Sequence, residues 1–502
     1  MSANKEKIII GNCSGFYGDR LSAAKDMVEG GPIDVLTGDY LAELTMTILY
    51  NQRMKRGEDQ GYVGTFLKQF KDVAKNCEEK NIKIVTNAGG LNPSSMATKI
   101  EEIVQELNLN LKVAYIDGDD LIPRFEELKE AKEPLNNIEK GNSLHDYEKT
   151  PLTANAYFGA WGIKEALDAG ADVVVCPRVT DAAVVIGPAA WKYNWSRDNF
   201  DALAGALAAG HIIECGAQAT GGNYSFFQEV PSFLNIGYPI AEIFEDGSFT
   251  ITKHPGTGGL VSVGTVTAQL LYEIGSPAYV NPDVIGHFDT LKMEQESEDR
   301  VHVSGCRGSS APKSHKVCVN LAGGFRNGTE ILLTGLDIEE KAKLVTDLIF
   351  NNVGGREQFD QVDVQLIRTD HLNPNSNEEA QASLRISVMS QNPDLVGRLF
   401  SAKIVELGLA SIPGYTGRSG IASGPYIQYW PALIDSKFIT EKVHIDGKTI
   451  DVQPTSQMDF EEIYYQKEPY ENKLPEIKGY QSTQFGKLYG TRSGDKGGCA
   501  NL

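Results

Sequence analysis

The stretch Ile82–Leu107, IKIVTNAGGLNPSSMATKIEEIVQEL, carries the pattern that decides the fold. Its first five residues are mainly apolar and β-branched, which predicts a strand buried on both faces. A loop of Asn, Gly and Pro follows. From Ser94 onward apolar residues recur every three or four positions, as they do in an amphipathic helix. A buried strand that leads through a polar loop into a helix is the building unit of a parallel α/β sheet.

The same unit recurs through the first part of the chain. Further strands are expected at Lys7–Ile10, Ile33–Leu36, Leu111–Ile116 and Asp172–Cys176, and further helices at Arg20–Glu29, Leu41–Lys55, Gly64–Lys80 and Thr153–Ala169. This alternation predicts a doubly wound, largely parallel α/β domain in residues 1–224. Hairpin signals after that point, such as Asp246-Gly247, predict an α+β domain in residues 225–452. Residues 453–502 are expected to form a polar tail.

Charge and cysteine usage exclude several classes of protein. The 502-residue chain has 47 Lys and Arg against 67 Asp and Glu, a net charge of −20 that repels nucleic acid and anionic membrane surfaces. Its seven cysteines are scattered and never form C-x-x-C, so neither a disulfide framework nor a zinc knuckle is indicated. The N-terminus lacks a signal peptide and no apolar run is long enough to span a bilayer. We therefore expect a cytoplasmic protein without nucleic-acid or membrane partners.

Polar loops follow each strand of the first domain. Because the carboxyl ends of parallel strands meet at one edge of a sheet, these loops predict a shared ligand site. The candidate substrate-binding residues in them are Asn12, Ser14, Gly15, Asp39, Asn87, Gly89 and Asn92. Turn geometry alone explains each loop taken singly.

No cofactor follows from these loops. The first loop spaces its glycines as G-x-x-x-G-x-x-G, which differs from the dinucleotide fingerprint, and there is no Walker A lysine. The strand-end carboxylates Asp39, Asp117, Asp119, Asp120 and Asp181 could gather around a divalent cation, although solvated turn residues explain them as well, so no metal ligand is assigned. The first loop could still bind a carboxylate or phosphate through its backbone N–H groups.

Two segments offer side chains for catalysis. Arg178 and Asp181 share one strand-end turn, and a cation beside a carboxylate suits binding an anion and moving a proton. On the expected helix before residue 216, His211 and Cys215 lie four residues apart on one face, with Glu214 beside them. An imidazolium next to a thiol would activate a nucleophile, although a buried, inert cysteine fits the same pattern. The candidate catalytic residues are Asp181, Arg178, His211, Glu214 and Cys215.

A second set of ligand loops lies further along the chain. The segment Lys253–Gly259 joins a strand to a helix, and its glycines would let an anion approach the helix N-terminus. The alternative is a tight turn with no ligand. The candidate binding residues here are Gln218, Thr220, Lys253, Gly256, Thr257, Gly258 and Gly259.

Several longer blocks point to one family. They are GFYGD at 15–19, DYLAELTM at 39–46, TNAGGLNP at 86–93, RVTD at 178–181 and GHIIECGAQATGGN at 210–223. With these blocks the chain resembles the acyclic terpene utilisation family (AtuA, the DUF1446 core domain) over nearly all of residues 8–435. The resemblance implies a role in the catabolism of acyclic terpenes, which proceeds through branched acyl-CoA thioesters.

The resemblance leaves two classes of function open. One is a lyase or hydratase that acts on a branched carboxylic acid or its acyl-CoA thioester, by hydration, dehydration or C–C lysis. The other is a non-catalytic scaffold or subunit that completes a partner enzyme. Family members often carry a small C-terminal domain that begins near a Ser-Gly-Asp-Lys-Gly motif. Here that motif, Ser493–Gly497, stands close to Leu502. The expected partners are thus a small-molecule substrate, further copies of the chain, or a separate chain that supplies this domain.

Overall fold

The computed structural model describes residues 6–147, 149, 151–418 and 422–453, together with two short strands at 492–493 and 500–501. Two compact units make up the chain. The large unit contains residues 1–147, 153–319 and 431–502, and the small unit contains residues 148–152 and 320–430. The boundary expected near residue 225 therefore falls inside the large unit. Most of the expected polar tail lies outside the described residues, as does most of the Ser493–Gly497 motif.

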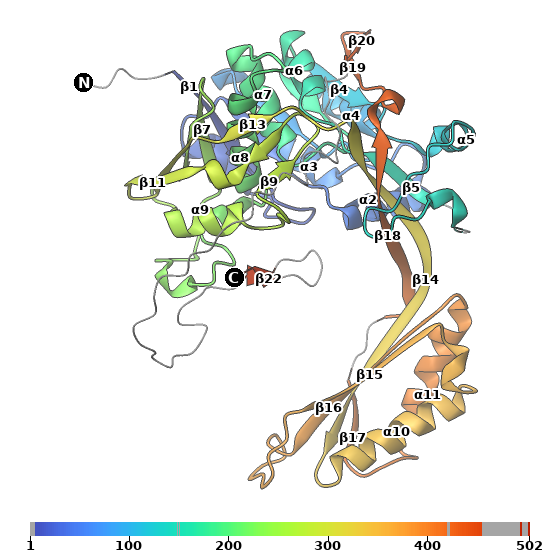
Figure 1. Cartoon of the computed structure of the whole chain (residues 1–502). Helices are drawn as coiled ribbons and strands as arrows, with labels where there is room; N and C mark the ends of the chain where they lie inside the picture. The colour runs from blue at the N-terminus through green and yellow to red at the C-terminus, as the bar shows by residue number, and fades with distance from the viewer. Residues whose placement is uncertain are drawn as a thin grey trace, which may run out of the picture. The chain divides into compact units, whose positions relative to one another are not determined.

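An eleven-stranded sheet forms the centre of the large unit (Figure 1). Its five middle strands run parallel and are, in spatial order, β1 (Lys7–Asn12), β2 (Val35–Gly38), β3 (Lys83–Thr86), β6 (Val173–Val175) and β4 (Val113–Asp117). Antiparallel strands extend the sheet on the β1 side through β7 (Pro239–Phe244), β8 (Phe249–Lys253), β12 (Arg300–Ser304) and β11 (Lys292–Ser297), and on the β4 side through β19 (Lys442–Ile445) and β20 (Lys448–Asp451).

The complete sheet is mixed rather than largely parallel. Its outer strands come mainly from the part of the chain that the sequence assigned to a separate α+β domain. Hairpin signals reveal antiparallel pairing, but they do not reveal which sheet the hairpin joins. The fold is therefore a mixed α/β arrangement in which later strands complete the sheet begun by the N-terminal ones.

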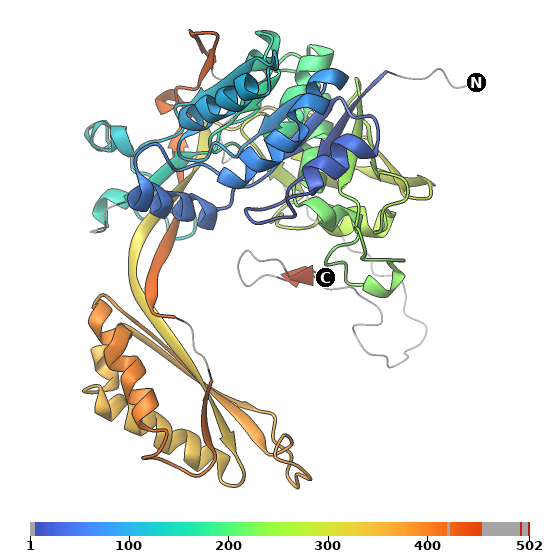
Figure 2. The same cartoon turned by 180° about the vertical axis from the view of Figure 1, so that it is seen from behind.

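Helices cover both faces of the sheet because its parallel strands are buried on both faces. Within β3, Ile84 belongs to one core and Val85 to the other. The helices α1 (Ala23–Gly30), α3 (Gly64–Lys80) and α4 (Pro93–Glu106) pack on the first core, and Figure 2 shows them in blue in front of the sheet. The second core contains α6 (Trp161–Asp168), α7 (Ala183–Tyr193) and α8 (Phe200–Ile213). The helix expected over Thr153–Ala169 is in fact strand β5 (Pro151–Ala156) followed by α6.

The small unit is an antiparallel sheet with helices packed on it. Strand β14 (Ser314–Thr334) pairs with β16 (Gln381–Ser390), β17 (Tyr415–Arg418) and β18 (Gly424–Asp435), and β16 pairs with β15 (Gln361–Arg368). The helices are α10 (Ile338–Asn352) and α11 (Phe400–Glu406). Alternate residues of the sheet, such as Ile331 and Leu384, are buried in one core with α10.

Candidate functional site

Loops from the carboxyl ends of β1, β2 and β3 contact one another in the large unit. The backbone N–H of Asp39 donates to the Ser14 carbonyl at 3.0 Å, which joins the first two loops. Asn87 joins the third loop, because its Nδ2 donates to Asp39 Oδ1 at 2.5 Å and its Oδ1 accepts from the Tyr40 N–H at 2.8 Å. All these contacts are buried. The residues gathered here, called the Asp39 cluster below, are Asn12, Ser14, Asp39, Asn87, Arg178, Asp181 and Glu214.

Arg178 reaches the cluster from the loop after β6 and is held on several sides. Its Nη2 donates to Asp181 Oδ1 at 2.6 Å and its Nη1 donates to the Leu41 carbonyl at 2.7 Å. The guanidinium carbon lies 4.2 Å from the centre of the Tyr157 ring. Its Nε is buried and has no hydrogen-bond partner. This leaves one buried donor that an oxygen atom of a ligand could satisfy.

Asp39 is the carboxyl group of the cluster without a cation of its own. Asp181 faces Arg178, and Glu214 Oε1 lies 3.4 Å from His211 Nδ1. Burial raises the pKa of Asp39 well above its usual value, and the charges of Asp181 and Glu214 raise it further. The opposing effects of Arg178 and of the Asn87 hydrogen bond are smaller. The surroundings of Asp39 thus favour its protonated form, and Asp181 lies beside it in an ion pair with Arg178.

Three residues that sequence reasoning missed surround the Arg178 side chain. The Tyr157 hydroxyl donates to Glu43 Oε1 at 2.8 Å, which fixes the ring that covers the guanidinium. Lys316 Nζ lies 4.8 Å from the same ring and 3.4 Å from Glu43 Oε1. These residues come from α2 (Glu43–Arg56), the end of β5 and the start of β14. No local sequence signal connects segments so far apart in the chain.

Asp119 contacts the backbone of Arg178 through its carboxylate. Its Oδ2 accepts from the Arg178 N–H at 3.3 Å and from Asn155 Nδ2 at 2.8 Å. Burial, followed by the charge of Asp120, raises the pKa of Asp119 to about 8. The sequence reading of Asp119 as a solvated turn carboxylate is corrected, since the residue is only 3% exposed.

His211 contacts Glu214 and the Leu270 carbonyl, and activation of the Cys215 thiol by His211 stays a prediction. Its Nδ1 faces Glu214, its Nε2 is bonded to the Leu270 carbonyl at 3.2 Å, and its ring packs against Tyr279. The Nδ1 atom is buried without a hydrogen-bond partner among the described residues. Burial lowers the pKa of His211, but the charge and close approach of Glu214, the charge of Glu273 and the Leu270 carbonyl together outweigh this effect, and the net shift is upward. His211 and Glu214 thus face each other at the wall of the cluster.

The end of α8 is fixed to the first loop through two close approaches. Asn12 Nδ2 donates to the Ile213 and Glu214 carbonyls, the second at 3.1 Å. A Cβ atom on Gly15 would lie 2.5 Å from the Cys215 carbonyl carbon, so only glycine fits at that position. Gly89 is similar, because its Cβ would meet the Cys176 carbonyl oxygen at 2.5 Å. These residues position the loops that carry the cluster.

Several other predicted binding residues make contacts within the fold. Lys253 Nζ pairs with Asp299 at 2.7 Å and donates to the Thr257 carbonyl at 3.0 Å, so its charge is already neutralised. Thr220 Oγ1 donates to the Gly237 carbonyl at 2.5 Å. Asn92 caps α4 by accepting from the Ser95 N–H at 3.2 Å. The remaining members of this set lie in the same turns: Gln218 in the turn after α8, and Gly256, Gly258 and Gly259 in the loop after β8.

Comparison with known proteins identifies the family. The family model described as acyclic terpene utilisation family protein AtuA matches residues 8–445. A search of curated proteins finds no match. Within the described residues no helix has the length and apolar character needed to cross a bilayer. Because the matched segment spans most of the chain and includes the whole Asp39 cluster, the protein belongs to the acyclic terpene utilisation family.

Proposed function

We propose that the chain is an acid–base lyase or hydratase that adds water to, or removes water from, a branched acyl substrate. The observation that carries the proposal is the contrast between two carboxyl groups of one site. Asp39 is buried in surroundings that raise its pKa and so favour its protonated form, whereas Asp181 is ion-paired with Arg178 and is the more accessible of the two. Environments that keep one carboxyl protonated and another ionised are the usual basis of paired acid–base catalysis.

In the dehydration direction the two groups have separate roles. Asp181 would remove a proton from the carbon next to the acyl carbonyl. Asp39 would donate its proton to the hydroxyl group on the neighbouring carbon, which leaves as water while a C=C bond forms. The buried Arg178 Nε–H would hydrogen-bond to the acyl oxygen as negative charge develops on it. Hydration is the reverse sequence, and both proton transfers then run in the opposite direction.

Family membership supports the choice of substrate class. The family is named for acyclic terpene utilisation, and the resemblance implies a catabolism that proceeds through branched acyl-CoA thioesters. The site carries one buried cation, Arg178, which suits a single carboxylate or thioester oxygen rather than a polyphosphate. We therefore place a branched 3-hydroxyacyl thioester or the corresponding free acid at the Asp39 cluster.

The test uses the full chain with branched 3-hydroxyacyl-CoA and enoyl-CoA compounds and with their free acids. Turnover is measured as the change in ultraviolet absorbance of the conjugated C=C bond, and deuterium uptake from heavy water reports proton transfer. Asp39→Asn should reduce turnover by about 10²–10⁴-fold, because it removes the acid. Asp117→Asn is the matched control, since Asp117 also ends a strand of this sheet but pairs with His444 at 3.0 Å.

The alternative function predicts a different set of results. A scaffold would bind none of these compounds, and its Asp39→Asn variant would behave as the parent chain does. Size-exclusion chromatography with light scattering, with and without a separately expressed C-terminal domain, would then show whether the chain completes a partner. Turnover by the chain alone would exclude the scaffold.

A further inference from the structure

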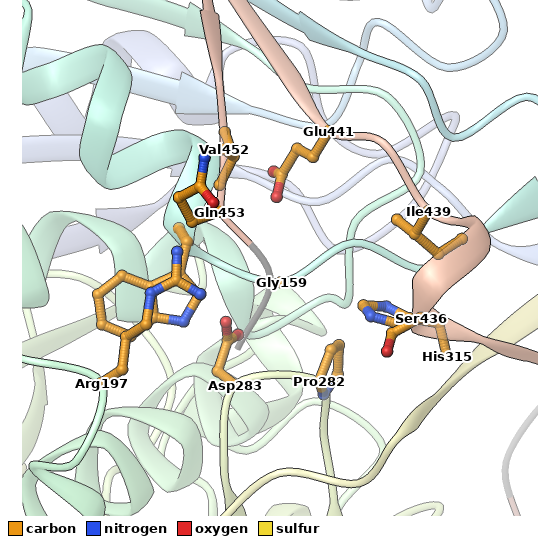
Figure 3. Close-up of a pocket in the computed structure, with 11 residues that line it drawn as sticks. Gly159, Arg197, Pro282, Asp283, His315, Ser436, Ile439, Glu441, Val452 and Gln453 are labelled. Carbon is orange, nitrogen blue, oxygen red and sulfur yellow. The ribbon is translucent and has the colours of Figure 1, made fainter. Parts of the chain in front are cut away.

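A cavity of about 40 Å³ lies at the start of α6, and none of its lining residues belongs to the Asp39 cluster. This volume exceeds the roughly 10–15 Å³ that a single water molecule requires. Figure 3 shows the carboxylates of Asp283 and Glu441 directed into the cavity from opposite sides. The other polar side chains that line it are Arg197, His315, Ser436 and Gln453, together with the indole of Trp161.

Two glycines bring the carboxylates against the backbone at the start of α6. A Cβ atom on Gly159 would lie 2.2 Å from Asp283 Oδ1, and one on Gly162 would lie 2.2 Å from Glu441 Oε1. The two carboxyl groups differ in the hydrogen-bond donors that face their oxygen atoms. Both oxygens of Asp283 accept from the Ala160 N–H, at 2.9 and 3.0 Å, whereas Glu441 Oε1 is shielded from solvent and has no donor. The start of α6 therefore satisfies Asp283, and the Gly162 backbone also contributes a hydrogen bond to Glu441, but the Oε1 atom of Glu441 remains without a donor among the described residues.

The charges around the cavity do not balance when both acids are ionised. Arg197, stacked 4.5 Å from the centre of the Trp161 ring, is the cation that acts on both. Burial raises the pKa of Asp283 to about 6. Burial also raises the pKa of Glu441 to about 8, with further contributions from the charges of Asp283 and Glu165. His315 adds no charge at neutral pH because burial lowers its pKa. Above about pH 8, where both acids are ionised, Arg197 thus faces two negative charges.

A second buried group in the cavity wall lacks a partner. Trp161 is 6% exposed, and its Nε1–H is buried without an acceptor. Glu441 therefore needs a cation or donor, whereas the indole needs an oxygen atom. A hydrated ion meets both needs, because the ion faces the carboxylates and its water accepts from the indole. The described residues contain no group of three His, Cys, Asp or Glu able to hold a metal ion, which argues against a divalent transition metal.

We propose that this cavity binds a monovalent cation of the size of K⁺ or NH₄⁺, held by Asp283 and Glu441 in competition with a proton. The oxygen atoms of Ser436 and Gln453 supply further neutral ligands for such an ion. The cation binds when Glu441 is ionised and is displaced when Glu441 is protonated. Affinity therefore rises with pH. The proposal is independent of the reaction at the Asp39 cluster.

The experiment measures thermal unfolding of the full chain in K⁺, NH₄⁺ and tetramethylammonium salts at equal ionic strength. Tetramethylammonium is too large for the cavity and serves as the reference. At about pH 8.5 we expect K⁺ or NH₄⁺ to raise the unfolding temperature by about 2–4 °C above the reference, and at about pH 6 we expect no difference. Equal unfolding temperatures in all three salts at the higher pH would overturn the proposal.

Variants separate this site from a general salt effect. Glu441→Gln should abolish the difference between the salts, whereas Glu165→Gln, which removes a nearby acid outside the cavity lining, should retain it. A cation-specific rise that persists in Glu441→Gln refutes the assignment. If that variant does not fold, crystals of the parent chain soaked in Tl⁺ decide the question. Anomalous density between Asp283 and Glu441 supports the site, and its absence there contradicts it.

Discussion

Replacing Arg178 by Met tests whether the buried ion pair acts as one unit. The side chain of Arg178 is 3% exposed and that of Asp181 is 18% exposed, and Arg178 Nη2 lies 2.6 Å from Asp181 Oδ1. Removing the cation leaves Asp181 without its partner and the Leu41 carbonyl without its donor, and it also ends the stacking on Tyr157. We expect Arg178→Met to lower the free energy of unfolding by about 3–5 kcal/mol. The variant should therefore lose stability as well as turnover.

The double variant Arg178→Met with Asp181→Asn gives the decisive comparison. With both charges removed, the main remaining cost is the unsatisfied Leu41 carbonyl, about 1–3 kcal/mol. The double variant should thus be more stable than Arg178→Met alone. Urea unfolding followed by tryptophan fluorescence measures this, because three of the four tryptophans, at 161, 191 and 195, lie in the large unit. If the double variant loses the sum of the two single losses, the pair does not interact and the reasoning fails.

Three further predictions follow from the same contacts. Gly15→Ala should lower the free energy of unfolding by about 1–3 kcal/mol, because its methyl group would meet the Cys215 backbone; Gly275→Ala, which has open space around it, should change stability by less than about 1 kcal/mol in the same urea titration. Asp119→Asn should flatten the pH dependence of stability. The raised pKa of Asp119 stabilises the folded state fully at a pH below the pKa of the unfolded chain, and this contribution is lost as the pH rises toward about 8. The free energy of unfolding of the parent chain should therefore fall across that pH window, whereas that of the variant should not. Urea denaturation at a series of pH values measures both. Asp39→Asn should leave the unfolding temperature within about 2–4 °C of the parent value, because burial raises the pKa of Asp39 and favours a neutral side chain. A larger fall in differential scanning fluorimetry would contradict this reasoning.

The parallel strands were predictable because their sequence signal is local. Segments such as Lys83–Thr86 are short, β-branched and followed by Gly and Asn, and the structure has a strand at that position. The helix Gly64–Lys80 was likewise expected with the bounds that the structure has. The segment Thr153–Ala169 misled because its apolar residues also fit helical spacing. Tertiary pairing turns its first part into β5, and no window of sequence contains that information.

Some residues of the candidate site could be predicted from the sequence and others could not. Asn12, Asp39 and Asn87 could be expected to gather, because each follows a strand whose neighbours in the sheet were predictable. Tyr157 and Lys316 could not, since they reach Arg178 only through the crossing of β5 and the start of β14. The prediction that Lys253 binds an anion took no account of Asp299, a loop residue whose carboxylate pairs with the Lys253 ammonium group. The sequence shows which polar and charged residues the loops contain, but it does not show which residue pairs with each charge.

Charge partners decide what the carboxyl groups of this chain can do. A chain with 67 acidic and 47 basic residues leaves some acids without a cation, and most of these can remain in water at little cost. An unmatched acid that is buried must instead hold a proton or attract a ligand. Asp39 and Glu441 are two such residues, in separate parts of the large unit. At Asp39 the neighbours are Arg178 and Asp181, and the proposed acid–base reaction depends on this ion pair. At Glu441 the neighbours are a cavity and an unsatisfied indole, which favour exchange of the proton for a cation.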